Sequence, residues 1–159
     1  MNEVEIGRSK RAINGYAFDD IAIVPTRRTR DPRDVSTSWS IDAFQFDMPV
    51  IAAPTDSAMS PATVIALGKL GGLGVLDLEG LWTRYEDPTK QLAEIANAKD
   101  EDATAVLQRV YSQPIQAELI KARLGEIRAA GVRVAGALSP QRTAEFSEIV
   151  LQSGVDMLV

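Results

Sequence analysis

The chain has 159 residues, a length that fits one domain and allows a hydrophobic core. Its residues are 45% hydrophobic and 25% charged, as in ordinary soluble proteins, and no apolar run approaches the ~20 residues of a membrane span. The net charge of −5 argues against nucleic acid as a partner. These properties, and an acidic first segment without an apolar signal region, predict a cytoplasmic, ligand-handling domain.

The chain contains no histidine and no cysteine. Their absence excludes histidine general bases, thiol nucleophiles and zinc sites built from nitrogen and sulfur ligands. The acidic residues show no spacing typical of a calcium-binding loop, so we assign no metal site.

Residues 1–48 predict an extension that precedes the main domain. The apolar run over residues 21–24, stopped by Pro25, is typical of an extended segment. A second extended piece is expected near residues 35–41, which include Trp39. Together the two pieces indicate a β-hairpin or lid.

From residue 49 onward, short apolar runs alternate with amphipathic segments. Each amphipathic segment opens with a Ser or Asp before Pro, which is typical of a helix N-terminus, and closes at a Gly, which is typical of a helix C-terminus. The openings are Ser60-Pro61, Asp87-Pro88 and Ser139-Pro140, and the closings are Gly71-Gly72, Gly131 and Gly154.

The apolar runs predict four strands, near residues 49–53, 73–77, 132–138 and 155–159. Because these runs are mostly continuous rather than alternating, we expect a parallel sheet buried on both faces. The fold class is therefore α/β, a (β/α)8 TIM barrel, of which residues 49–159 form the first half with about four βα units. Since a whole barrel takes roughly 250 residues, we expect a second half beyond Val159.

Polar residues follow the expected first strand, where parallel α/β folds bind ligands. Thr55, Asp56 and Ser57 place two hydroxyls and a carboxylate there. Two interpretations of Asp56 stay open: it faces a ligand, or it only braces the loop. Asp77 at the end of the second strand is a weaker candidate of the same kind, and Ser139 is expected to cap a helix.

The glycines between residues 68 and 74 do not predict a dinucleotide fingerprint. That motif follows a strand and opens a helix, whereas these glycines close a helix and open a strand. We expect them to serve helix termination and close packing.

Five segments, in order along the chain, resemble the IMP dehydrogenase and GMP reductase family. Residues 16–25 (YAFDDIAIVP) are similar to its F-D-D opening, and residues 34–37 (DVST) to its D-V-x-T step. Residues 48–56 (MPVIAAPTD) resemble its first strand and loop, residues 66–76 (ALGKLGGLGVL) its Gly-Gly step, and residues 154–159 (GVDMLV) its G-[AV]-D strand.

The resemblance implies NAD-dependent oxidation of inosine 5′-monophosphate to xanthosine 5′-monophosphate in purine nucleotide biosynthesis. It implies substrate contacts at Ala53, Pro54, Thr55 and Asp56, and it makes Asp77 a candidate for the cofactor. It places the catalytic residues, and a monovalent cation if one is used, in the second half, so this chain alone is expected to be inactive. It also implies a homo-oligomer, a tetramer or an octamer, and no membrane partner.

The chain departs from the family pattern at these positions. The family usually has Ser and Met in the first loop, where Ala53 and Thr55 stand, and His where Asp77 stands. The usual pair of CBS domains has no room between Thr83 and Arg133, which indicates a short branch of the family without them.

Three alternatives stay open. A GMP reductase resembles the same segments, and a flavin-dependent barrel of the nitronate monooxygenase class has a similar first strand and Gly-Gly step. A barrel of another class, which binds a nucleotide or a partner without turnover, fits the altered loop residues.

Overall fold

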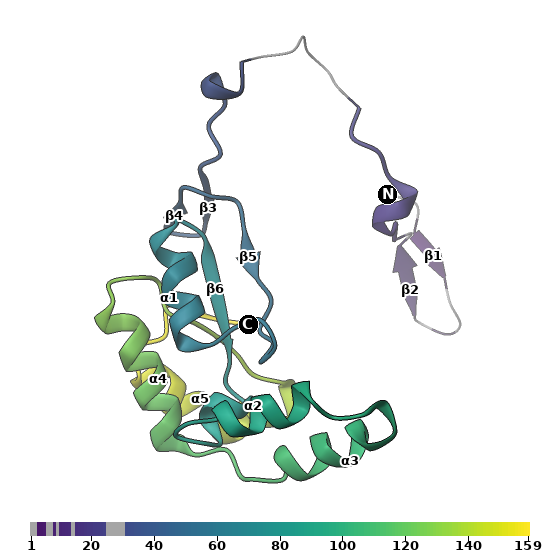
Figure 1. Cartoon of the computed structure of the whole chain (residues 1–159). Helices are drawn as coiled ribbons and strands as arrows, with labels where there is room; N and C mark the ends of the chain where they lie inside the picture. Colours follow the sequence, from purple (N-terminus) through teal and green to yellow (C-terminus); the bar gives the residue numbers. More distant parts are fainter. Residues whose placement is uncertain (1–2, 6–7, 9, 14, 25–30) are drawn as a thin grey trace. The chain divides into compact units, whose positions relative to one another are not determined.

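The computed structural model describes residues 3–5, 8, 10–13, 15–24 and 31–159, and the chain divides into two units, Met1–Ser36 and Thr37–Val159 (Figure 1). In the first unit, strands β1 (Glu3–Glu5) and β2 (Arg11–Ile13) pair antiparallel. Two short 3-10 helices follow, Phe18–Asp20 and Pro32–Asp34.

Residues 21–24, predicted as an extended segment of a β-hairpin or lid, belong to no hairpin in the described part of the chain. The described residues 21–24 form no strand, although the backbone at Ile21 is extended, because no described segment pairs with them. Ile23 is 99% exposed, so its apolar side chain contributes nothing to a core in this structure. Pro25 lies outside the described residues.

A β-hairpin opens the second unit, later in the chain than predicted. Its strands are β3 (Trp39–Ile41) and β4 (Phe44–Phe46), so only the end of the extended piece expected at residues 35–41 is a strand. Asp42 in the turn has φ 51°, a left-handed conformation that Asp tolerates better than most side chains. The ring of Trp39 stacks on Phe46 with 5.1 Å between centroids.

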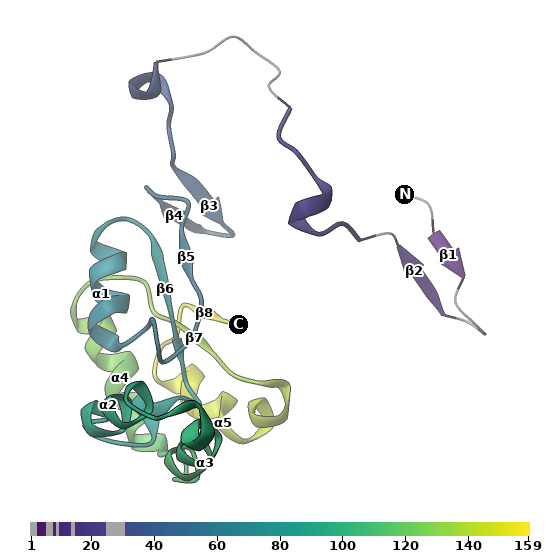
Figure 2. The same cartoon turned by 45° about the vertical axis from the view of Figure 1, so that its right-hand side comes forward.

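The predicted parallel sheet is confirmed, with four strands in the order β5-β6-β7-β8. The strands are shorter than expected: β5 (Ile51–Ala52), β6 (Leu73–Asp77), β7 (Ala135–Ala137) and β8 (Met157–Leu158). Helices α1 (Pro61–Lys69), α4 (Ala117–Ala129) and α5 (Pro140–Gln152) connect them, and both views place α1 beside α4 (Figures 1 and 2).

The second unit has a hydrophobic core on each face of its sheet. Leu76 belongs to the core shared with the helices, and its neighbour Val75 belongs to the core shared with the β3–β4 hairpin. Successive side chains of a strand point to opposite faces, which explains this division. The helix-side core includes Val64, Ile120, Leu124, Ile127, Val134, Phe146 and Val150, and the hairpin-side core includes Phe46, Leu73 and Ala135.

Two further helices, α2 (Thr89–Ala96) and α3 (Asp100–Val110), lie between β6 and α4 in the sequence. Both views show them at the carboxyl-end side of the sheet, opposite the β3–β4 hairpin (Figures 1 and 2). Ile115 lies in the connection between α3 and α4.

The predicted helix boundaries are confirmed in most places. Ser60 caps α1 and accepts a hydrogen bond from the Thr63 amide at 3.1 Å. Gly71, Gly131 and Gly154 have positive φ angles of 89°, 75° and 75°, as helix ends at glycine require. Ser139 occupies the N-cap position of α5, but its side chain makes no capping bond.

The cap predicted at Asp87 is one residue too early. Pro88 takes the N-cap position of α2, and Asp87 instead accepts a hydrogen bond from the Thr89 amide at 3.0 Å.

Among the described residues, no helix combines the length and apolar character needed to cross a membrane. The closure of a (β/α)8 barrel and the division into an extension over residues 1–48 and a half-barrel over residues 49–159 stay predictions.

Gly74 of β6 provides a test of the packing between the sheet and α1. A Cβ atom there would lie 2.7 Å from the Cα of Val64, so Gly74→Ala should lower the free energy of unfolding by about 1 to 3 kcal/mol. Gly125 in α4 has open space around it, so Gly125→Ala should raise it by about 0.5 to 1 kcal/mol. Urea denaturation measures both, and a Gly74→Ala protein as stable as the wild type would contradict the close approach.

Candidate functional site

The predicted site residues lie at the carboxyl ends of the first two parallel strands. Residues 53–56 follow β5 directly, and Asp77 is the last residue of β6. Because β5 and β6 are paired in parallel, their ends meet at one edge of the sheet. The structure therefore places these residues where ligands bind in parallel α/β folds.

The loop after β5 separates two pockets. Ala53 and Pro54 line a pocket of about 480 Å³ on the hairpin-side face of the sheet, together with strand residues that include Val75 and Met157. Thr55 and Asp56 line a different pocket, of about 620 Å³, together with residues of α2 and α3. The four residues predicted to contact one substrate are thus divided between two cavities.

Asp56 holds the loop to two other segments. Its Oδ2 accepts a hydrogen bond from the Leu81 amide at 2.7 Å and another from the Tyr111 hydroxyl at 2.6 Å. Its Oδ1 is buried and has no hydrogen-bond partner among the residues that the structure describes. These contacts are those of a brace, which was one of the two interpretations left open, and a ligand contact of Asp56 stays a prediction.

Gly80 packs directly against this carboxylate. A Cβ atom at position 80 would lie 2.8 Å from the Asp56 carboxyl carbon, so only glycine fits beside it without displacing the side chain. The loops after β5 and β6 are therefore held together both by hydrogen bonds and by close contact.

Asp77 and Glu79 add two acidic groups to the same edge. Asp77 accepts a hydrogen bond from the Glu79 amide at 2.9 Å, and the Glu79 carboxylate accepts one from the Ser139 amide at the start of α5. Burial raises the pKa of Asp77, and the charges of Asp56 and Glu79 raise it further, against the opposing effects of the Glu79 amide bond and the Arg84 charge. Both acidic side chains already have protein partners.

Two functional candidates were missed from the sequence, Arg84 and Tyr111. Arg84 donates to the carbonyl oxygens of Glu79 at 2.8 Å and Tyr111 at 3.0 Å, and its guanidinium carbon lies 5.7 Å from the centroid of the Tyr111 ring. Burial raises the pKa of the Tyr111 hydroxyl, and its bond to Asp56 adds to this rise. Since 55 residues separate Tyr111 from Asp56, no local pattern could have connected them.

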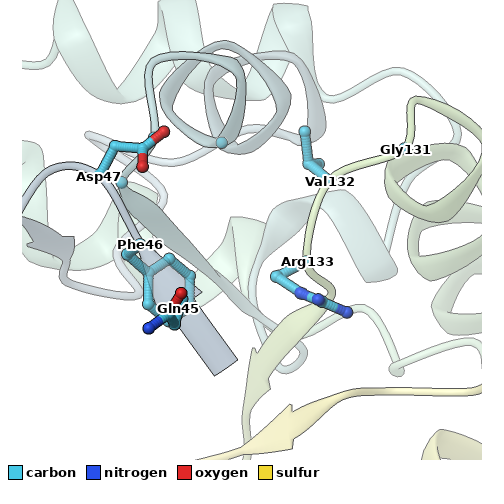
Figure 3. A pocket seen from close by; sticks show the side chains of 9 residues that line it. Gln45, Phe46, Asp47, Gly131, Val132 and Arg133 are labelled. Carbon is cyan, nitrogen blue, oxygen red and sulfur yellow. The ribbon is translucent and has the colours of Figure 1, made fainter. Parts of the chain in front are cut away.

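A third pocket lies at the opposite end of the sheet (Figure 3). It has a volume of about 340 Å³, and Asp47 and Arg133 lie at its margin. Its glycines serve packing, as predicted: a Cβ atom at Gly68 would lie 2.7 Å from the Cβ of Val132, and one at Gly71 would lie 2.8 Å from the Cβ of Asp47. We assign this end of the sheet to stability rather than ligand binding.

In the described part of the chain, no group of three or more His, Cys, Asp or Glu side chains is placed to hold a metal ion. Asp56, Asp77 and Glu79 form an acidic edge at the carboxyl ends of β5 and β6, and its negative charge suits hydrogen-bond donors, such as hydroxyl and amide groups, better than phosphate.

The bond between Tyr111 and Asp56 gives a prediction about stability. Tyr111→Phe removes one of the two donors to a partly buried carboxylate, and we expect a loss of about 1.5 kcal/mol in the free energy of unfolding. Tyr16→Phe is the control, because Tyr16 is 72% exposed, and it should change stability by less than about 0.5 kcal/mol. Equal urea midpoints for the two variants would contradict the bracing role of Tyr111.

The raised pKa of Asp77 predicts a pH dependence. A carboxyl group whose pKa is higher in the folded state binds its proton more tightly there than in the unfolded state. Its contribution to the free energy of unfolding is therefore fully present below the usual pKa of 3.8, and it is lost as the pH rises through the folded-state pKa. Asp77→Asn keeps a hydrogen-bond acceptor for the Glu79 amide, but its side chain does not titrate, so the variant does not lose this stability as the pH rises. The variant should therefore gain stability relative to the wild type as the pH rises above about 3.8.

Asp87→Asn is the control of opposite sign. The hydrogen bonds from Thr89 lower the pKa of Asp87, so the wild type should gain stability over this variant as the pH rises towards and beyond 3.8. Denaturation midpoints measured at a series of pH values compare both variants with the wild type. An Asp77→Asn difference that is flat with pH would show that burial does not perturb Asp77.

Comparisons with known proteins agree with this geometry. The family model described as IMP dehydrogenase / GMP reductase domain matches residues 15–159. An uncharacterized oxidoreductase of Mycobacterium leprae is 45% identical over 98% of this chain and 43% of its own length. The inosine-5′-monophosphate dehydrogenase of Methanocaldococcus jannaschii is 34% identical over 41% of this chain and 13% of its own length.

A crystal structure of an IMP dehydrogenase/GMP reductase-like protein from Corynebacterium glutamicum superposes with a TM-score of 0.84 at 42% identity. The match covers 98% of this chain and 43% of that one. The chain thus spans less than half the length of the relatives that match nearly all of it. With the family model matched from residue 15 to residue 159, the predicted resemblance is confirmed, and the chain belongs to the IMP dehydrogenase / GMP reductase family.

Proposed function

We propose that this chain forms one wall of the nucleotide pocket of an NAD-dependent oxidoreductase that converts inosine 5′-monophosphate to xanthosine 5′-monophosphate. The observation that carries the proposal is the place of residues 53–56 at the carboxyl end of β5 in a chain of this family. The proposal concerns a protein longer than this chain, as its relatives are.

Ala53 and Pro54 supply the surface on which a purine ring would lie. They line a largely apolar pocket of about 480 Å³, a size typical of small-molecule sites. Asp56 supports them from behind, because its bonds to Leu81 and Tyr111 fix the loop that carries them. The contribution of this wall is binding and orientation of the purine.

Asp77 is proposed to contact the cofactor. NAD supplies the hydride acceptor, and its ribose hydroxyls and nicotinamide amide are hydrogen-bond donors that suit the acidic edge formed by Asp56, Asp77 and Glu79. The same edge does not suit a pyrophosphate, which we expect to be held by other parts of the protein. A carboxylate at position 77 therefore orients hydroxyl or amide groups and holds no phosphate.

The reaction itself needs residues that this chain does not have. Without cysteine or histidine it provides neither a thiolate to attack the purine ring nor an imidazole base. We propose that the second half of the barrel supplies the nucleophile, the phosphate contacts and any monovalent cation. We further propose a homo-oligomer, a tetramer or an octamer, in the cytoplasm, with a role in purine nucleotide biosynthesis.

Assays of the full-length protein separate this function from its alternatives. Formation of NADH from NAD and inosine 5′-monophosphate supports the dehydrogenase, whereas oxidation of NADPH with guanosine 5′-monophosphate would assign a reductase. A purified protein with the visible absorption of a flavin would assign the monooxygenase class. Binding of the nucleotide without turnover in either direction would assign a non-catalytic barrel, which Ala53 and Thr55 in place of the usual Ser and Met would then explain.

A substitution at Ala53 tests the proposed wall. Ala53→Asp adds a carboxylate beside a phosphate-bearing ligand, so it should weaken the binding of inosine 5′-monophosphate at least about tenfold through repulsion and loss of apolar contact. Ala62→Asp adds the same charge on the exposed first turn of α1, where an acidic residue is favoured, and should leave binding unchanged. Calorimetry measures both, and equal affinities would remove Ala53 from the binding site.

A further inference from the structure

We infer that the pocket between the loop at residues 55–57 and helices α2 and α3 binds a small neutral or cationic molecule with an aromatic or aliphatic body. This pocket of about 620 Å³ is separate from the one beside Ala53 and Pro54. Its volume is within the range of small-molecule sites. The inference does not rest on the proposed function, since it follows from this cavity alone.

The wall of the pocket is built from apolar side chains that the fold itself does not bury. Leu92, Ile95 and Ala96 share one face of α2 by their spacing, and no side chain of α2 is buried. On α3 only Val110 is buried, and the neighbouring Leu107 in the pocket is 41% exposed. Apolar surface gathered in a concave site and left open to water favours an apolar occupant.

One end of the pocket is polar. The hydroxyls of Thr55 and Ser57 lie 3.3 Å apart, and the Asp56 carboxylate lies between them in the sequence. The two hydroxyls can accept hydrogen bonds from a ligand that carries hydroxyl, amine or amide groups, and the carboxylate, already bonded to Leu81 and Tyr111, adds negative charge. This end of the pocket orients a ligand whose body lies against α2 and α3.

The charge of the pocket selects against anions. None of the described residues that line it is basic, and Asp56 contributes a negative charge. Asp77 and Glu79 add to the negative potential at this edge, and Arg84 offsets part of it while bonded to the carbonyls of Glu79 and Tyr111. A phosphate or carboxylate ligand would meet repulsion, whereas a neutral or cationic one would not.

A ligand in this pocket would contact the loop that also forms the first pocket. Thr55 lines the pocket beside α2 and α3, and Pro54, one residue earlier, lines the pocket on the sheet. Tyr111 lines the second pocket and also holds Asp56, so an occupant would touch both ends of that hydrogen bond. Occupancy is therefore expected to alter the position or mobility of the loop.

The fluorescent probe N-phenyl-1-naphthylamine, which is neutral and aromatic, tests the pocket in the full-length protein. We expect a saturable rise in its fluorescence. Leu107→Glu places a charge in the apolar wall, and Ala96→Phe fills the space, so each should weaken probe binding at least about tenfold. Leu151→Glu is the matched control, because Leu151 is a 65% exposed leucine on α5, away from this pocket, and it should change the affinity less than about twofold.

Circular dichroism of each variant checks that it is folded, and Ala96→Phe carries the test if Leu107→Glu does not fold. The inference is overturned if the wild type shows no saturable binding up to the solubility of the probe. It is equally overturned if the folded pocket variants bind the probe as tightly as Leu151→Glu does. Binding of inosine 5′-monophosphate, measured separately, reports on the first pocket, so failure of one proposal leaves the other intact.

Discussion

The burial of β6 on both faces is the constraint on which the second unit depends. Its residues pair with β5 on one side and with β7 on the other, and its side chains belong alternately to the helix-side core and the hairpin-side core. Gly74 lets α1 approach so closely that a Cβ atom would meet the backbone of Val64. Because β6 ends at Asp77, this packing also fixes the position of the carboxyl-end edge of the sheet.

At that edge, one carboxylate organises several loops. Asp56 connects the loop after β5 to the 3-10 helix Leu81–Thr83 and to the end of α3, and Glu79 connects the loop after β6 to the start of α5. These are hydrogen bonds of charged groups, which are stronger than neutral ones when partly buried. The edge is thus held in place before any ligand arrives, and preorganisation of this kind reduces the cost of binding.

The helices α2 and α3 add two further elements to this edge of the sheet. They contribute Tyr111 to the bracing of Asp56, and with the loop at residues 55–57 they enclose a second cavity. The family relationship accounts for the parallel strands and for the loop after β5, whereas the cavity depends on side chains that no local motif connects. Two adjacent pockets that share one loop offer a direct physical route by which an occupant of one can influence the other.

The sequence by itself determined the class of the fold and the order of its elements. The signals are local: continuous apolar runs, Ser60 before Pro61, and glycines at positions 71, 131 and 154. In the structure the apolar runs form the strands of the parallel sheet, Ser60 caps α1, and the glycines adopt positive φ angles at helix ends. The family resemblance was also readable, because its segments are contiguous. The extended segment expected at residues 21–24 forms no strand, because a strand needs a partner and the pattern of one segment contains no information about another segment.

Only the tertiary structure decided what the candidate site residues contact. The sequence indicated Asp56 as a ligand contact or a brace, and the choice depends on Leu81 and Tyr111, which are 25 and 55 residues away. It grouped Ala53 and Pro54 with Thr55 and Asp56, whereas the turn of the backbone after β5 directs them to different cavities. Contacts between distant segments arise from packing of the whole unit, so residues that carry no local signal, such as Arg84 and Tyr111, become visible only there.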